Sequence, residues 1–300
     1  MFKTILSEKS NIPYPTFLIL SSDCCYEEQA LRSEAEKKGF KAFFIGLNEI
    51  DFELETQAKI IWQDQDLLKL IDKKSVICIR RSRGNFEKML TVLNIFETRK
   101  IRYSDSFRGV TANLDKSICL PGFESKIIPN ILPTYFVSKE NLENFDFKNI
   151  IFPCITKPVS GRHGEGFMKH NDLKSLKKFL MNLKNKVILQ PFLDIYEEYR
   201  IFVIGNKSYG AVKKIKAKNT LIANAHAGAV FQKVSLAQKF HKEAVSLCKK
   251  SGIEIGGIDF VQTKDGKYFS LEINRCPEFQ VFEKATNQNI AKEIIDFLCR

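Results

Sequence analysis

The sequence lacks the features that mark a membrane or secreted protein. No apolar run reaches the length of a membrane span, and the first residues lack the apolar core of a secretory signal. The eight cysteines include no pair at the Cys-x-x-Cys spacing that zinc sites use. We therefore expect a protein of the cytoplasm, with no membrane partner and with reduced thiols rather than a disulfide framework.

Two familiar nucleotide-binding loops are also missing. The turn after the first predicted strand, residues 21–25, has no Gly-x-Gly-x-x-Gly, so a dinucleotide-binding Rossmann site is unsupported. No glycine-rich loop runs into the Gly-Lys-Ser/Thr of a P-loop. Internal repeats and low-complexity linkers are absent as well. Any nucleotide site in this chain must therefore be of another kind.

The charge balance points to an acidic partner. The chain has 300 residues, enough for one to three domains, and a formal net charge of +12. Such a balance favours a nucleotide, an acidic peptide or a nucleic acid as partner. However, aromatic and basic residues do not interleave in any RNA-recognition motif. We therefore do not expect specific nucleic-acid binding.

The N-terminal part alternates short apolar runs with helical patterns. We predict strands at residues 17–21, 41–47 and 75–79, and helical segments at 26–39 and 67–71. This alternation predicts a small parallel sheet. Arg80 and Arg81 follow the third strand, at the edge where open α/β sheets bind ligands. They could bind an acidic substrate, or they could belong to a solvated basic loop.

A hairpin near the C-terminus carries the strongest local signal. Two β-rich runs flank Asp265-Gly266, a frequent two-residue turn. That turn would place Asp259 directly opposite Glu272, with Asn274 on the same face as Glu272. Two carboxylates that face each other repel, unless a cation lies between them. Two carboxylates and an amide oxygen suit Mg²⁺, with Mn²⁺ as a second choice. The alternative is a surface hairpin whose acids point to water, and a bulge would spoil the register.

The middle of the chain contains a glycine-rich loop. A predicted strand at residues 152–157 ends at Lys157 and runs into a loop with Gly161, Gly164 and Gly166. Backbone N–H groups of such loops approach phosphate oxygens, and the lysine adds a point charge. A helix at 172–183 follows, with an apolar stripe that we assign to core packing: Leu173, Leu176, Phe179, Leu180 and Leu183. Further strands are predicted at 187–193, 201–204 and 210–216. Helices are predicted at 236–250, with a stop at Gly252, and at 289–298.

Taken in order, these segments resemble the ATP-grasp superfamily, and specifically its RimK-like carboxylate–amine ligases. The similarity runs from about residue 75 to the C-terminus, through motifs at residues 113–116, 155–158, 189–193, 198–203, 257–260 and 271–277, and a closing helix at 282–291. The resemblance implies an α/β (α+β) ATP-grasp fold behind an N-terminal Rossmann-like domain. It implies three domains, at residues 1–108, 109–186 and 187–300.

The resemblance also implies a role for individual residues. The ATP phosphates would contact Lys116, Lys157 and the loop residues Ser160, Gly161, Gly164 and Gly166. The adenine hinge would be Gln190, Pro191, Phe192 and Leu193, with Asp194 or Glu197 on the ribose. Asp259, Glu272 and Asn274 would hold magnesium, in agreement with the hairpin argument.

Catalytic and substrate contacts follow in the same way. Arg200 resembles the family arginine that contacts the reacting carboxylate or the γ-phosphate, and Lys214 stands where a second arginine is common. Asn224 and His226 match the substrate-side loop, although a lone histidine is more often structural. Glu278 stands where the family commonly has glycine, which puts a standard glutamate-ligase assignment in doubt. Likewise, Pro191 replaces a frequent glutamate, but its carbonyl can still accept a hydrogen bond.

The implied reaction phosphorylates a carboxylate with ATP and lets an amine attack the acylphosphate, with release of ADP and phosphate. We expect an acidic carboxylate acceptor and an amino-acid amine donor, in an enzyme that acts alone or as a homo-oligomer. The alternatives are a ligase that crosslinks or macrocyclises a ribosomal peptide, a non-catalytic ATP-binding protein, and a basic RNA-interacting protein.

Overall fold

The computed structural model describes residues 15–112, 132–159, 166–216 and 229–300. The chain divides into two compact units. The first unit comprises Met1–Ser104 and Ile290–Arg300, and the second comprises Asp105–Asn289. No helix in the described ranges is both long and apolar enough to cross a membrane. The predicted three-domain boundaries stay a prediction.

The first unit is built on a three-stranded parallel sheet in the order β2-β1-β6. Its strands are β1 (Thr16–Ser21), β2 (Lys41–Gly46) and β6 (Val76–Ile79), so the predicted parallel sheet is confirmed. Every residue of β1 is buried. Helix α1 (Tyr26–Lys37) packs against α8 (Ile290–Leu298), and α2 (Phe86–Thr98) follows β6. The chain leaves α1 through Gly39, whose φ of +89° is a left-handed conformation that favours glycine.

A small antiparallel sheet in this unit escaped sequence analysis. It consists of β3 (Ile50–Leu54), β4 (Ala58–Trp62) and β5 (Gln65–Asp66), followed by a 3₁₀ turn at Leu67–Leu70. Gln63 and Asp64 form the β4–β5 turn, and both have positive φ. This geometry is usually signalled by Asn-Gly or Asp-Gly, so a Gln-Asp turn gives little warning in the sequence.

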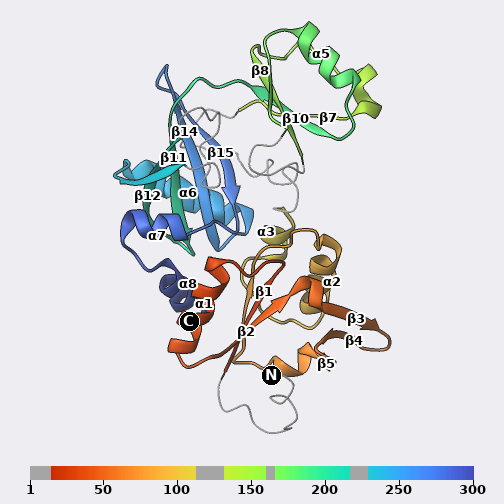
Figure 1. The fold of residues 1–300 in the computed structure, drawn as a ribbon, viewed down its shortest axis with the longest axis vertical. Helices are drawn as coiled ribbons and strands as arrows, with labels where there is room; N and C mark the ends of the chain where they lie inside the picture. The colour runs from red at the N-terminus through yellow and green to blue at the C-terminus, as the bar shows by residue number, and fades with distance from the viewer. Residues whose placement is uncertain (1–14, 113–131, 160–165, 217–228) are drawn as a thin grey trace. The chain divides into compact units, whose positions relative to one another are not determined.

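The second unit contains two antiparallel sheets. The four-stranded sheet has the order β7-β10-β8-β9, with β7 (Tyr135–Val137), β8 (Cys154–Pro158), β9 (Met168–His170) and β10 (Val187–Pro191). Helix α5 (Leu173–Met181) lies beside it in Figure 1 and begins at the N-cap Asp172. Leu176, Leu180 and Leu183 of its apolar stripe are buried, but Leu173 in the first turn is exposed, which corrects that part of the prediction.

The five-stranded sheet has the order β13-β12-β11-β14-β15. Its strands are β11 (Ile195–Ile204), β12 (Lys207–Ile215), β13 (Val230–Val234), β14 (Ile255–Thr263) and β15 (Tyr268–Asn274). Helix α6 (Gln238–Ser251) packs on one face and ends at Gly252, which has a left-handed φ of +71° as the predicted stop requires. The described part of this unit also contains the short helices α3 (Phe107–Ala112) and α7 (Gln280–Thr286) and a 3₁₀ helix at Lys139–Asn144.

Candidate active site

The β14–β15 hairpin places the predicted metal ligands, although by a different route from the expected one. The Thr263 N–H donates to the Lys267 carbonyl, so the turn contains three residues, and the two-residue turn at Asp265-Gly266 is wrong. Three-residue turns of this kind commonly place glycine in the left-handed region, and Gly266 has a φ of +81°. This turn alone would shift the register by one residue.

A β-bulge restores the register. Asp259 pairs with Glu272 while the next residue, Phe260, pairs with Ser270, which leaves Leu271 as the extra residue on β15. The longer turn and the bulge therefore offset each other. The predicted pairing of Asp259 with Glu272 is confirmed.

The two faces of this sheet differ completely. One face presents apolar residues to α6, including Ile201, Ile258 and Phe260. Because side chains alternate along a strand, the neighbouring positions point to the other face. There Arg200 on β11 pairs with Asp259 on β14, and Asp259 pairs with Glu272 on β15. We call the set of Glu198, Arg200, Lys214, Asp259, Glu272 and Asn274 the polar row.

Arg200 and Asp259 form a forked ion pair at the centre of the polar row. The arginine Nε lies 2.7 Å from one carboxylate oxygen of Asp259, and Nη2 lies 2.8 Å from the other. Asp259 is only 2% exposed. Two parallel charge-assisted hydrogen bonds fix both planar groups, so the arginine is held in one orientation.

Lys214 joins this pair from the neighbouring strand. Its ammonium nitrogen lies 2.5 Å from Asp259 Oδ2 and 2.6 Å from Glu198 Oε1. Glu198 and Lys214 are directly opposite each other on β11 and β12. The lysine is 6% exposed, so its charge is compensated inside the protein by two acids.

The two acids that contact Lys214 have opposite pKa shifts. Burial alone would raise the pKa of Asp259, but the charges of Arg200 and Lys214 outweigh it and lower that pKa to about 2. Burial raises the pKa of Glu198; the charge on Lys214 opposes this shift and the charge on Asp259 adds to it. Asp259 therefore stays ionised over the physiological range, and Glu198 is the more readily protonated acid.

The three predicted metal ligands lie together at the outer end of the row. Asn274 Nδ2 donates to Glu272 Oε1 at 3.1 Å and to Asp259 Oδ2 at 3.4 Å. Glu272 is exposed, so one end of the row is open. Across the described part of the chain, no three His, Cys, Asp or Glu side chains are grouped as a metal site, so the third ligand would be the Asn274 amide. Two carboxylates and an amide oxygen are hard donors that fit Mg²⁺.

Only part of the predicted nucleotide site is described by the structure. Lys116, Ser160, Gly161 and Gly164 lie outside the described residues, as do the substrate candidates Asn224 and His226. Lys157 is on β8, opposite Ile188 of β10. Gly166 has a φ of +74°, and a Cβ there would lie 2.6 Å from Pro158 Cγ, so this position requires glycine.

The predicted adenine hinge leaves the four-stranded sheet at the end of β10. The Gln190 side chain is buried, and its amide nitrogen donates a hydrogen bond to Thr134 Oγ1 at 2.8 Å. This hydrogen bond links the end of β10 to the residue that precedes β7. Pro191 ends the strand, and the Phe192 N–H donates to the Pro153 carbonyl at 2.8 Å. The ammonium of Lys169 lies 3.9 Å from the centre of the Phe192 ring. The expected Leu193 N–H donor to adenine stays a prediction.

The two candidates for the ribose contact, Asp194 and Glu197, differ in the interactions that their carboxylates form within the chain. Glu197 forms an ion pair with Lys213 and accepts a hydrogen bond from Tyr199. Hydrogen bonds from those two residues lower the pKa of Glu197. Asp194 is exposed and forms an ion pair with the exposed Lys264, at 2.9 Å. Asp194 is thus the more accessible carboxylate, and a ribose contact stays a prediction for both residues.

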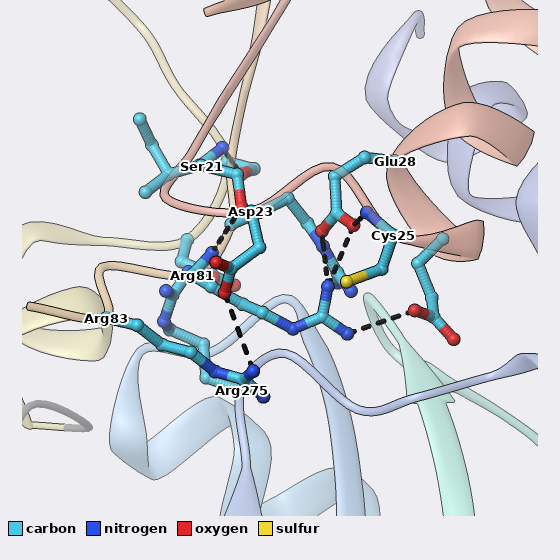
Figure 2. A network of polar contacts seen from close by, with 12 residues as sticks. Ser21, Asp23, Cys25, Glu28, Arg81, Arg83 and Arg275 are labelled. Atoms are coloured by element: carbon cyan, nitrogen blue, oxygen red, sulfur yellow. Dashed lines mark hydrogen bonds and ion pairs between the residues drawn. The ribbon is translucent and has the colours of Figure 1, made fainter. Parts of the chain in front are cut away.

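Arg80 and Arg81 are enclosed by acids of their own chain. Figure 2 shows the Arg81 guanidinium facing Glu28. Arg81 Nη1 lies 2.7 Å from Glu28 and Nη2 lies 3.0 Å from Glu27, while Arg80 Nε lies 3.1 Å from Glu28. Both arginines are buried. The acidic partner expected for them is supplied by α1, and contact with a substrate stays a prediction.

Glu278 and Glu198 are the remaining acids of interest. Glu278 is half-buried, between Pro277 and the start of α7, and its effect on specificity stays a prediction. The sequence pattern assigns no role to Glu198, the first residue of the motif at 198–203. Its position two residues before Arg200 on one strand, hence on the same face, was the available signal.

Comparison with known proteins identifies the family of this chain. The family model of the RimK-like ATP-grasp domain matches residues 129–298, more than half of the chain. A Legionella pneumophila (strain Corby) protein named "Probable alpha-L-glutamate ligase" is 28% identical over 212 residues, 69% of this chain and 70% of the relative. A Vibrio vulnificus (strain YJ016) protein of the same name is 28% identical over 151 residues, 49% and 50% of the two chains.

Solved structures share the fold over nearly the whole chain. The ATP-grasp ligase PsnB, complexed with a minimal precursor, has a TM-score of 0.72 at 19% identity and covers 95% of this chain and 98% of its own. The macrocyclase MdnC of Microcystis aeruginosa MRC, bound with precursor peptide MdnA, has a TM-score of 0.70 at 20% identity, with 95% and 99% covered. The chain therefore belongs to the RimK-like ATP-grasp family, whose members are ATP-dependent ligases that form C–N bonds.

Proposed function

We propose that this ligase uses ATP and Mg²⁺ to join an amino acid to an acidic peptide, a protein or a small carboxylate. The observation that carries the proposal is the polar row, in which two carboxylates and an amide stand beside a fixed arginine on one sheet face. The net charge of +12 supports an acidic acceptor, and relatives named as probable alpha-L-glutamate ligases support an amino acid as the second substrate.

The residues of the chain divide the work between positioning and charge neutralisation. Asp259, Glu272 and Asn274 would hold Mg²⁺, which, when bound, neutralises charge on the ATP phosphates. Arg200, oriented by its fork with Asp259, would stabilise charge on the transferred phosphoryl group or the reacting carboxylate. Lys157 and Gly166 would bind phosphates. The carboxylate, once phosphorylated, would be attacked by the amine, so no nucleophile from the protein is required.

A mass measurement tests this proposal. The protein is incubated with Mg-ATP, mixed amino acids and a panel of acceptors that includes peptides ending in glutamate and small dicarboxylates. We expect an acceptor to gain the mass of one amino acid less water, together with release of ADP. An acceptor panel that stays unmodified while no ADP forms would contradict ligase activity and favour a non-catalytic ATP-binding protein.

Macrocyclisation of a peptide is the second candidate. The solved ligases that bind precursor peptides share the fold over 95% of this chain. This reaction joins an acid and an amine of the same peptide. A peptide that loses the mass of water, with no amino acid added, would distinguish it from the first candidate.

A further inference from the structure

Glu198 is the one acid of the polar row for which the proposed function has no use. It lies on β11 opposite Lys214 and accepts a hydrogen bond from that lysine at 2.6 Å. Only 12% of its side chain is exposed. Burial of a carboxylate is costly unless a cation compensates its charge, and here Lys214 is that cation.

The geometry shows Lys214 shared almost equally between two acids. Its ammonium lies 2.6 Å from Glu198 and 2.5 Å from Asp259. Asp259 already accepts two hydrogen bonds from Arg200. Without Glu198, the whole charge of the buried lysine would fall on Asp259, which would then be paired with two full cations.

Counting charges shows what this would change. The row contains three acids, Glu198, Asp259 and Glu272, and two cations, Arg200 and Lys214. It therefore has a surplus of one negative charge, and removing the charge of Glu198 would leave none. The adjacent pair of Glu197 and Lys213 does not alter this balance, because those two residues neutralise each other. The attraction of a site for a divalent cation depends on this surplus.

We propose that Glu198 is a positioning residue that takes up the charge of Lys214 and so keeps Asp259 available to a divalent cation. Lys214 then acts through Asp259, as a bridge between two acids. This inference rests on the proposed function, because it concerns the same cation site.

A series of charge-removing substitutions tests the inference in the full-length protein. Binding of Mn²⁺, a paramagnetic probe, is measured by electron paramagnetic resonance in the presence of ADP, for wild type, Glu198→Gln, and Glu198→Gln combined with Lys214→Met. We expect Glu198→Gln to weaken Mn²⁺ binding about tenfold, the scale of outer-shell changes at metal sites. The double variant has the same surplus charge as wild type, so its affinity should return to within about threefold.

Matched variants separate this role from a merely structural one. Asp265→Asn removes one negative charge from the loop of the same hairpin and should leave Mn²⁺ binding unchanged, whereas Glu198→Asp preserves the charge and most of the affinity. If Glu198 only supported the fold, the double variant would bind no better than Glu198→Gln. If the Glu198→Gln variant does not fold, the double variant alone decides the question. A roughly tenfold loss of Mn²⁺ affinity in the double variant would overturn the inference.

The outcomes for the inference and for the proposed function are distinguishable. Wild-type protein that binds Mn²⁺ with ADP, together with a Glu198→Gln variant of equal affinity, would overturn the role of Glu198 and leave the proposed function standing. Wild-type protein that binds no Mn²⁺ in the presence of ADP would overturn both.

Discussion

Two buried ionic clusters in this chain use similar residues for different ends. In the first unit, Arg80 and Arg81 face Glu27 and Glu28, two cations against two acids. All four side chains are buried. In the second unit, Arg200 and Lys214 face three acids, and the outermost, Glu272, is exposed.

The difference lies in charge balance and access. A balanced cluster whose cations and acids pair with each other can fix a loop or a helix, but it has no surplus negative charge to attract a cation. A cluster with surplus negative charge and one open end can attract a cation.

The largest effect is expected from a substitution of Glu272, the exposed acid of the second cluster. We expect Glu272→Ala to lower ligase activity by about 10²- to 10³-fold, the scale for losing a group that stabilises transition-state charge. Because Glu272 is exposed, the free energy of unfolding should change by less than about 0.5 kcal/mol. ADP release and urea unfolding measure the two effects. Full activity in this variant would rule out the metal assignment.

The enclosed cluster should respond in the opposite manner. Glu28→Gln removes an acid that serves both Arg80 and Arg81, and leaves buried positive charge without full compensation. We expect the first unit to lose about 3 kcal/mol of stability, as for other broken buried ion pairs. Urea unfolding followed by circular dichroism checks this. A loss no larger than that of an exposed pair, such as Arg32→Met, would show that the cluster is not structural.

The two clusters should also differ in how their contributions to stability depend on pH. Burial raises the pKa of Glu28, but the charges of Arg80 and Arg81 outweigh it and lower the pKa below 4.5. The stabilisation from Glu28 is therefore present above about pH 4.5 and is lost as the pH falls through the folded-state value. Glu198 has a raised pKa, so its ionisation opposes folding and protonation relieves that cost. Urea unfolding from about pH 7 to about pH 3 should show a steeper loss in wild type than in Glu28→Gln.

The smallest effect concerns a cation that has an aromatic partner instead of an acid. Lys169 lies over the ring of Phe192 on an exposed part of β9. We expect Lys169→Met to cost about 0.5 kcal/mol of stability, the value for exposed cation–π contacts. The measurement is thermal unfolding of wild type, Lys169→Met and Lys169→Arg. The arginine variant retains the cation and is the matched control. A cost above that of Glu28→Gln would contradict the importance assigned to buried acid partners.

Sequence analysis predicted what depends on local patterns. Alternating apolar runs were enough for the parallel sheet, and Gly252 was enough for the end of α6. The β3–β4–β5 sheet was missed because its turn uses Gln63 and Asp64 in a conformation that those residues rarely signal. Local chemistry therefore predicted regular elements well and unusual turns poorly.

The candidate site depended on partners distant in sequence. Glu28 and Arg80 are 52 residues apart, and no local pattern links them, so Arg80 could be interpreted as a substrate contact. Glu198 and Lys214 come together only because β11 and β12 pair in one register. The pairing of Asp259 with Glu272 was predictable because a single hairpin contains both residues.

The bulge at Leu271 has a consequence for how this hairpin can change in length. One residue more or fewer in the turn would rotate Glu272 and Asn274 to the opposite surface of the sheet, away from Asp259. A bulge gained or lost at the same time reverses that rotation. Homologous hairpins should therefore accumulate insertions and deletions in pairs, one at the turn and one within β15. An alignment that places a single gap between the two acids would misassign the second one.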